Sequence, residues 1–378
     1  MNKLIYLDNS STTKPCKSAI ENVNRCLTNV WGNPSSLHTL GFEAELLLTE
    51  ARTAVSKTIH CREDEVFFTS GGTEANNIAI LGAVNALKRR GNRIITTSIE
   101  HPSVLNIFEK LKNDGFDVVY LHPNKDGNIE ESDIEKAITK DTILISMMLV
   151  NNEVGSILPV ERISYYVKKV DSPALIHCDA VQGYGKLPID VKKLGVNLLT
   201  ASGHKIHAPK GVGFLYKSKG VNLHQTVFGG GQEKGLRSGT EGIPAICGLA
   251  GAIKELGDIS KSLNEMKELN SYARRILTDT SLVKINSPEN ALPFILNICI
   301  EGYKSETLLH FLESKNIFVS SGSACSKGTK SYVLKEMGIS EKEIDSSLRL
   351  SFSRENTKEE IEILVKELAN AAKILKRV

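Results

Sequence analysis

The residue of this sequence best suited to covalent chemistry is Lys205, which lies in a turn-rich stretch between residues 197 and 213. An apolar run precedes it, Gly203 comes two residues before it, and Pro209 and Gly211 follow it. These neighbours restrict the backbone, so the amine is expected to be held at the end of a buried strand. Burial lowers the pKa of a lysine, and an uncharged amine can form a Schiff base with a carbonyl cofactor such as pyridoxal phosphate. Most lysines are solvated surface charges, so position alone leaves that alternative open.

A glycine turn supplies a second candidate feature. Ser70-Gly71-Gly72-Thr73-Glu74 separates a predicted strand at residues 66–69 from a predicted helix that runs to about residue 90. The first N–H groups of a helix point outward with the helix dipole behind them, which is a site for a phosphate group. Ordinary strand-to-helix turns also use glycine and a threonine cap, so the turn alone leaves both interpretations open.

Polar side chains follow the ends of four predicted strands. In order along the chain they are His101, Asn152, Asp179 with Gln182, and Lys205. In an open sheet of parallel strands these ends meet at one edge, where ligands bind. A carboxylate there can pair with a pyridine nitrogen and keep it protonated, and Asp179 is the natural choice. Taken singly, Asp179 could instead cap a loop and His101 could be a turn residue before proline.

The elements that must position these residues follow from length and pattern. The chain has 378 residues, of which 41% are hydrophobic and 24% charged, as in a globular protein of two unequal domains. Strands and helices alternate from residue 65 onward, which predicts an α/β fold with a mostly parallel sheet flanked by helices. We place this large domain at residues 15–255 and a smaller α/β domain at residues 1–14 and 256–378. A long helical stretch from residue 243 to about residue 278 is predicted to join them.

Composition excludes several classes of function. The net charge of +3 comes from 47 basic and 44 acidic residues, so no direct nucleic-acid partner is expected. No signal peptide and no membrane span are predicted, so we expect a cytoplasmic protein without a membrane partner. The seven cysteines form no C-x-x-C pair, which argues against a disulfide framework and a metal site.

Cys325 differs from the other cysteines in its context. It lies in a tract of small residues at positions 320–328, which has no apolar anchor and is expected to move. Lys327 lies nearby, and a neighbouring positive charge lowers the pKa of a thiol and favours the nucleophilic thiolate. An ordinary loop cysteine is the alternative that these residues alone leave open.

The sequence resembles the cysteine desulfurases of the NifS/IscS type, which are class V aminotransferase-like, fold-type I pyridoxal phosphate enzymes. The resemblance covers nearly the whole chain, and so many motifs in one order are jointly specific. The motifs are Leu7-Asp8-Asn9-Ser10-Ser11-Thr12-Thr13, Gly32-Asn33-Pro34-Ser35-Ser36, Thr69-Ser70-Gly71-Gly72-Thr73-Glu74, Glu100-His101, Asn151-Asn152-Glu153-Val154-Gly155, Asp179-Ala180-Val181-Gln182, Ser202-Gly203-His204-Lys205, Gly229-Gly230-Gly231-Gln232-Glu233, Arg237-Ser238-Gly239-Thr240 and Ser320-Ser321-Gly322-Ser323-Ala324-Cys325.

The resemblance implies a role for each residue of a pyridoxal phosphate site. Lys205 would hold the cofactor, Asp179 would meet its ring nitrogen, and His101 would stack on its ring. Asn152 and Gln182 would flank its phenolic oxygen. Its phosphate would be held by Gly72, Thr73, Ser202 and His204, with Thr240 contributed by the other subunit of a homodimer.

The resemblance also implies a substrate and a sulfur carrier. L-Cysteine would be bound by Arg349, Asn152 and Asn9, with Arg354 as the less favoured arginine. Lys205, His101 and Cys325 would be the catalytic residues. Cys325 would receive the sulfur as a persulfide, and it is also a candidate transient ligand of an iron–sulfur cluster.

The physiological acceptor of the sulfur is left open by the sequence. The stretch after Cys325 and the C-terminal tail are shorter than in the housekeeping cluster-assembly enzymes. The acceptor is therefore expected to be either an iron–sulfur scaffold or a tRNA-thiolating enzyme. One alternative is a selenocysteine lyase or another class V enzyme. The other is a sulfur-protein scaffold without a cofactor, and the presence of both Lys205 and Asp179 argues against it.

Overall fold

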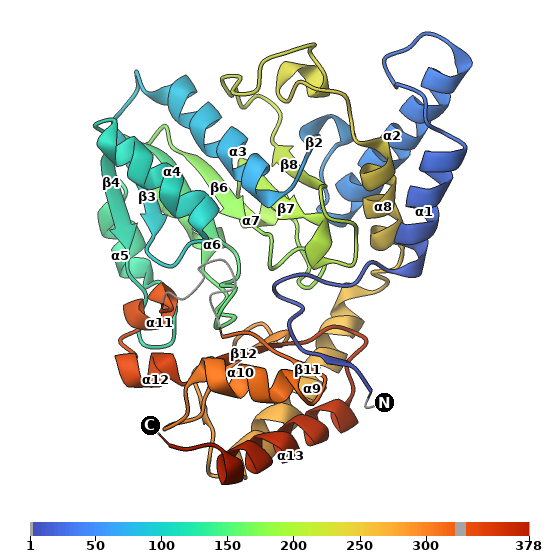
Figure 1. Ribbon diagram of the computed structural model, residues 1–378. Helices are drawn as coiled ribbons and strands as arrows, with labels where there is room; N and C mark the ends of the chain where they lie inside the picture. The colour runs from blue at the N-terminus through green and yellow to red at the C-terminus, as the bar shows by residue number, and fades with distance from the viewer. Residues whose placement is uncertain (1–2, 322–329, 378) are drawn as a thin grey trace.

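A seven-stranded sheet forms the centre of the computed structural model, which describes residues 3–321 and 330–377 (Figure 1). Its strand order is β2-β8-β7-β6-β5-β3-β4. The strands are β2 (Val66–Thr69), β3 (Arg93–Thr97), β4 (Asp117–Leu121), β5 (Thr142–Met148), β6 (Leu175–Asp179), β7 (Leu198–Ser202) and β8 (Gly213–Lys217).

The sheet is mostly parallel, as predicted. Neighbours from β4 to β7 pair in parallel, whereas β8 is antiparallel to both β7 and β2. The sequence analysis did not predict β8. Only residues 203–212 join it to β7, a connection short enough for an antiparallel return and too short for a parallel crossover.

Helices cover both faces of this sheet because alternate residues of the strands point to opposite faces. Ile94 packs with helices α3 (Gly72–Leu87) and α4 (Pro102–Asn113), whereas Ile95 belongs to the core on the other face, with α6 (Val160–Lys169). The same hydrophobic core includes residues of α5 (Glu131–Ala137), α7 (Val191–Leu194), α1 (Lys17–Thr28), α2 (Thr39–Thr58) and α8 (Ile243–Lys254). Helix α1 was not predicted from the sequence.

Two smaller sheets form the lower part of the molecule in Figure 1. Strand β1 (Ile5–Tyr6) pairs in parallel with β11 (Ile317–Phe318), so the N-terminus lies against a segment from near the other end of the chain. The second sheet has the antiparallel order β12-β10-β9. The remaining elements are β9 (Lys284–Ile285), β10 (Ile295–Cys299), β12 (Ser347–Ser351), α9 (Ile259–Thr278), α10 (Ser305–Glu313), α11 (Tyr332–Glu336), α12 (Glu341–Asp345) and α13 (Lys358–Ile374).

The long helical stretch predicted from residue 243 to about residue 278 is helical but divided. Two helices, α8 and α9, occupy this stretch, and Gly257 between them adopts a positive φ of 62°. Asp258 then caps α9 by accepting hydrogen bonds from the backbone N–H groups of Ser260 and Lys261. The division into residues 15–255 and residues 1–14 with 256–378 stays a prediction.

Within residues 3–321 and 330–377, the helices are too short or too polar to cross a membrane.

Candidate active site

A cavity of about 660 Å³ opens where the parallel strands β3, β5, β6 and β7 end. The structure thereby brings together most of the side chains predicted for the site. Those that line the cavity are Gly72, Thr73, His101, Asn152, Asp179, Gln182, Ser202, His204, Lys205 and Arg349.

The N-terminus of α3 forms one end of this cavity. Gly72 begins the helix, and a Cβ atom there would lie 2.7 Å from Cγ2 of Val181, so the turn requires glycine at this position. The N–H groups of the first helical turn have no partner within the helix and suit an anion. His204 adjoins them, and burial together with nearby lysines lowers its pKa to about 4, so its imidazole is neutral at pH 7.

Asp179 ends β6 and is held by two donors. Its Oδ1 accepts a hydrogen bond from the backbone N–H of Val181 at 2.9 Å, and its Oδ2 accepts one from Nδ2 of Asn76 at 2.8 Å. These two hydrogen bonds fix the orientation of the carboxylate. Asn76 also lines the cavity, yet the sequence analysis did not select it. The available signal was its place one helical turn beyond Gly72, on the same face of α3.

His101 caps the N-terminus of α4. Its Nδ1 lies 3.1 Å from the backbone nitrogen of Ser103, which donates to it, and 2.9 Å from Oγ of the same serine. Burial lowers the pKa of His101, the charge of Lys205 lowers it further, and Asp179 opposes both effects. Tyr332, the first residue of α11, also lines the cavity and donates its hydroxyl proton to the backbone carbonyl of Glu100.

Lys205 points to the segment that follows β1. Its Nζ donates to the carbonyl oxygens of Ser10, at 2.5 Å, and Ser11, at 2.9 Å. Nε2 of Gln182 donates to the same Ser10 carbonyl at 3.0 Å. The segment after the N-terminal strand therefore closes one side of the site, although it lies almost 200 residues away in sequence.

A buried lysine, Lys186, lies close to the half-buried Lys205. Its Nζ donates to Oε1 of Gln182 at 3.3 Å, which orients the amide of that glutamine. Burial lowers the pKa of Lys186 to about 7, and the charges of Lys205 and Arg349 contribute. The sequence analysis did not identify this residue.

Arg349 lies on β12 and is buried, with 2% of its side chain exposed. Its Nη1 donates to the carbonyl of Asn152 at 3.0 Å, and its Nη2 donates to Oδ1 of Asp8 at 2.9 Å and to Oγ of Ser11 at 2.7 Å. Its guanidinium is thus fixed at the cavity wall. Arg354, the alternative, instead pairs with Glu255 at 3.0 Å at a partly exposed position.

Two buried carboxyl groups support the ends of β3 and β5. Burial raises the pKa of Glu100 to about 8, and it raises the pKa of Glu153 to about 7. Oε2 of Glu153 accepts a hydrogen bond from the hydroxyl of Ser331 at 2.5 Å, which ties the start of α11 to the cavity wall.

Two predicted site residues that the structure describes, Asn9 and Thr240, do not line the cavity. The amide of Asn9 donates to the carbonyls of Ser351, at 2.9 Å, and Tyr6, at 3.3 Å. Thr240 is exposed on the surface. Cys325 lies outside the described residues.

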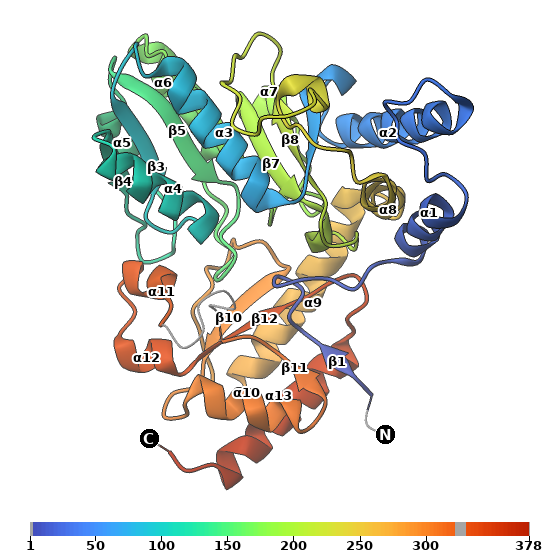
Figure 2. The same ribbon diagram turned by 45° about the horizontal axis from the view of Figure 1, so that its top comes forward.

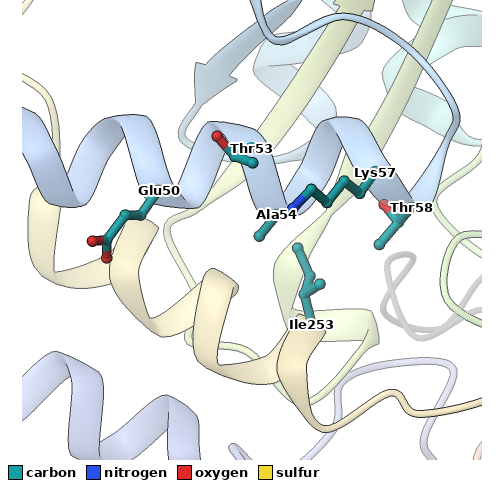
Figure 3. Close-up of a pocket in the computed structure, with 6 residues that line it drawn as sticks. All are labelled: Glu50, Thr53, Ala54, Lys57, Thr58 and Ile253. Carbon is teal, nitrogen blue, oxygen red and sulfur yellow. The ribbon is translucent and has the colours of Figure 1, made fainter.

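Another hollow lies between α2 and α8, remote from the strand ends (Figure 3). Its charged side chains, Glu50 and Lys57, are two helical turns apart along α2 and do not converge on a point. This hollow therefore offers no set of groups for chemistry, in contrast to the cavity at the strand ends.

The residues of the main cavity fit a phosphorylated pyridine aldehyde. The helix terminus at Gly72 suits a phosphate, Asp179 suits a ring nitrogen, and Lys205 supplies an amine. Oδ1 of Asn152 is buried in the wall and has no hydrogen-bond partner among the described residues, so a ligand with a donor or a shared proton would satisfy it.

Comparisons with known proteins agree with this geometry. The profile of the family described as Aminotransferase class-V matches residues 5–364. A protein of Clostridium botulinum named cysteine desulfurase IscS is 39% identical to this chain, over 99% of this chain and 95% of its own length. Among solved structures, one titled NifS-like protein has a TM-score of 0.93 at 35% identity and covers 99% of this chain and 100% of its own. Another, titled SspA in complex with cysteine, has a TM-score of 0.82 at 33% identity and covers 92% and 98%.

Proposed function

The chain belongs to the class-V aminotransferase family and, within it, to the cysteine desulfurases, and on this premise we propose that it converts L-cysteine into L-alanine with pyridoxal phosphate as its cofactor. The observation that carries the proposal is the placement of Lys205, Asp179 and Arg349 around one cavity. They supply an amine, a carboxylate for a ring nitrogen and a fixed guanidinium. When bound, pyridoxal phosphate accepts electrons from the α-carbon of an amino acid.

Each residue of the chain has a separate task in this proposal. The amine of Lys205 would hold the cofactor carbonyl and would carry the α-proton of the substrate. Asp179 would keep the ring nitrogen protonated, since the donors from Val181 and Asn76 hold its carboxylate in place. The N-terminus of α3, with Gly72, Thr73, Ser202 and His204, would hold the phosphate.

Arg349 binds the carboxylate of L-cysteine. Its guanidinium is already oriented by Asp8 and Ser11, so little side-chain entropy is lost on binding. Asn152 and Gln182 face the same space, and His101 lies over it at the start of α4.

Sulfur leaves the substrate by attack of a thiolate, for which Cys325 is the proposed nucleophile. A sulfur–sulfur bond to Cys325 forms as the carbon–sulfur bond of the substrate breaks, and the β-carbon takes a proton to give alanine. The enzyme is left with a persulfide, which it passes to an acceptor protein for iron–sulfur cluster assembly or tRNA thiolation.

The active protein in this proposal is a cytoplasmic homodimer. Thr240 is exposed, as is required of a residue that reaches the phosphate of the partner subunit. The exposure of Thr240 supports the proposal, and an experiment with mixed dimers tests its contact with the phosphate of the partner subunit.

The test is incubation of the purified protein with L-cysteine, with alanine and sulfide measured in the presence of a reducing thiol. Equal amounts of the two products are expected, and pyruvate should not accumulate. Formation of pyruvate and ammonia, or turnover of selenocysteine alone, would overturn the assignment in favour of a lyase of another specificity.

A further inference from the structure

A chain of buried hydrogen bonds runs through the sheet and ends at Asp179. The members other than Asp179 are Ser146 on β5, His177 on β6, Thr200 on β7 and Asn76 on α3, all 0% exposed. The separations are 2.8 Å from Ser146 Oγ to His177 Nδ1, 3.4 Å from His177 Nε2 to Thr200 Oγ1 and 2.6 Å from Thr200 Oγ1 to Asn76 Oδ1. The last link, from Asn76 Nδ2 to Asp179 Oδ2, is 2.8 Å.

The direction of donation in this chain is fixed by chemistry. A carboxylate only accepts, so Asn76 must turn its NH₂ group to Asp179 and its carbonyl to Thr200. The single hydroxyl proton of Thr200 is then donated to Asn76, and His177 must donate to Thr200 from Nε2. Burial lowers the pKa of His177 to about 3, so it carries one proton and its Nδ1 accepts from Ser146. All donors therefore point toward Asp179.

Asn76 also reaches the second functional group of the cavity. Its Nδ2 lies 2.9 Å from Oγ of Ser103, so its second N–H is donated there. Ser103 Oγ in turn lies 2.9 Å from Nδ1 of His101, and the backbone N–H of Ser103 donates to the same Nδ1 at 3.1 Å. A nitrogen that accepts from a backbone N–H carries no proton, so neutral His101 holds its proton on Nε2.

We propose that Asn76 is a positioning residue that holds Asp179 and His101 in a fixed relation, as the last donor of a one-way chain of hydrogen bonds. Helix α3 lies across the sheet in front of β6 and β7, which places Asn76 between the two groups (Figure 1). Donors linked in series polarise one another, and a charge-assisted bond at the end of such a series is stronger than an isolated one. The consequences for cofactor binding and for the reaction rest on the proposed function, whereas the tautomer of His101 does not.

The first measurement is the nitrogen NMR spectrum of the full-length protein labelled with ¹⁵N-histidine. Nine histidines are present, and comparison with His101→Gln assigns the signal of interest. The expected result is an unprotonated Nδ1 and a protonated Nε2 in the protein both with and without pyridoxal phosphate. A protonated Nδ1 would overturn the proposal.

The second measurement is the affinity of the cofactor-free protein for pyridoxal phosphate, with Asn76→Ala as the variant. Loss of a hydrogen bond to a charged group predicts a dissociation constant roughly 10-fold higher or more. Asn77→Ala is the matched control, since Asn77 lies on the same helix and, among the described residues, donates to the carbonyl of Thr73 alone. If Asn76→Ala lowered the thermal stability but left the affinity for pyridoxal phosphate at the parent value, the role of Asn76 would be merely structural and the proposal would be overturned.

Thr200 gives a second route if Asn76→Ala does not fold. Thr200→Val keeps the shape but leaves the carbonyl of Asn76 without its donor, whereas Thr200→Ser keeps the hydroxyl. Weaker cofactor binding in Thr200→Val and recovery in Thr200→Ser are expected. In turnover with L-cysteine, Asn76→Ala and Thr200→Val should lower kcat and leave KM near the parent value, because Arg349 is untouched. Equal affinity in both Thr200 variants would overturn the proposal, even if the protein proved inactive toward L-cysteine.

Discussion

Replacement of Arg349 by lysine tests how the site binds the substrate. The arginine uses two nitrogens, with Nη1 on the carbonyl of Asn152 and Nη2 on Asp8 and Ser11. A lysine keeps the positive charge, so Asp8 retains a counter-ion, but one ammonium nitrogen cannot reproduce the fork. The loss of one charge-assisted hydrogen bond to the substrate carboxylate costs about 1.5 to 3 kcal/mol. We therefore expect kcat/KM for L-cysteine to fall roughly 10- to 100-fold, mainly through KM.

The assay is the initial rate of alanine formation as a function of L-cysteine concentration. Cysteamine, which lacks the carboxylate, provides the internal reference, because it should be an equally poor substrate or competitor for Arg349→Lys and for the parent. Arg354→Lys is the matched control, since Arg354 forms a partly exposed pair with Glu255 whose net contribution is small. Thermal unfolding confirms that both variants fold. The reasoning is refuted if Arg354→Lys raises KM for L-cysteine while Arg349→Lys does not.

Three further predictions address the buried acid, the sulfur carrier and the dimer. Burial raises the pKa of Glu100 from 4.5 to about 8, so the folded protein keeps a proton that the unfolded chain releases, and the unfolding free energy contributed by Glu100 falls as pH rises from about 4.5 to 8. Glu100→Gln has no carboxyl group to titrate, so its free energy of unfolding, measured with urea, should rise by about 3 kcal/mol relative to that of the parent between pH 5 and pH 8. An identical pH dependence of the unfolding free energy in both proteins would contradict the raised pKa of Glu100. Cys325→Ala should bind pyridoxal phosphate with the parent spectrum yet form almost no persulfide, and labelled sulfur on another cysteine at the parent rate would exclude Cys325 as carrier. Mixed dimers of Lys205→Ala and Thr240→Ala subunits should regain activity, since one hybrid site carries neither change; proven heterodimers without activity would show that each site is built within one chain.

Much of the scaffold was predictable from short-range patterns. The apolar run of β2 is bounded by turn residues, and its predicted limits, residues 66–69, agree with the structure. The alternation of strand and helix also predicted that the ends of β3, β5, β6 and β7 would meet. The break between α8 and α9 had a signal in Gly257 and Asp258, a glycine followed by a helix cap, but the apolar pattern on both sides outweighed it.

The missing parts of the site depend on contacts between distant segments. Nothing near Lys205 in sequence indicates that its amine meets the carbonyls of Ser10 and Ser11, because backbone carbonyls carry no sequence signature. Nothing in the sequence distinguishes Asn76 from an ordinary helical asparagine, because its contacts with Asp179 and Thr200 depend on how α3 packs over β6 and β7. Asp8 lies in a predicted motif, but its pairing with Arg349 depends on how the segment after β1 approaches β12.

The central claim is that Lys205 carries the cofactor at the meeting point of these strand ends. The most direct measurement is reduction of the purified, yellow protein with borohydride, followed by proteolysis and mass spectrometry. The account predicts one pyridoxyl group per chain on the peptide that contains Lys205, and none on that of the buried neighbour Lys186. A label on Lys186 or any other lysine, or no label on a protein saturated with pyridoxal phosphate, would contradict it.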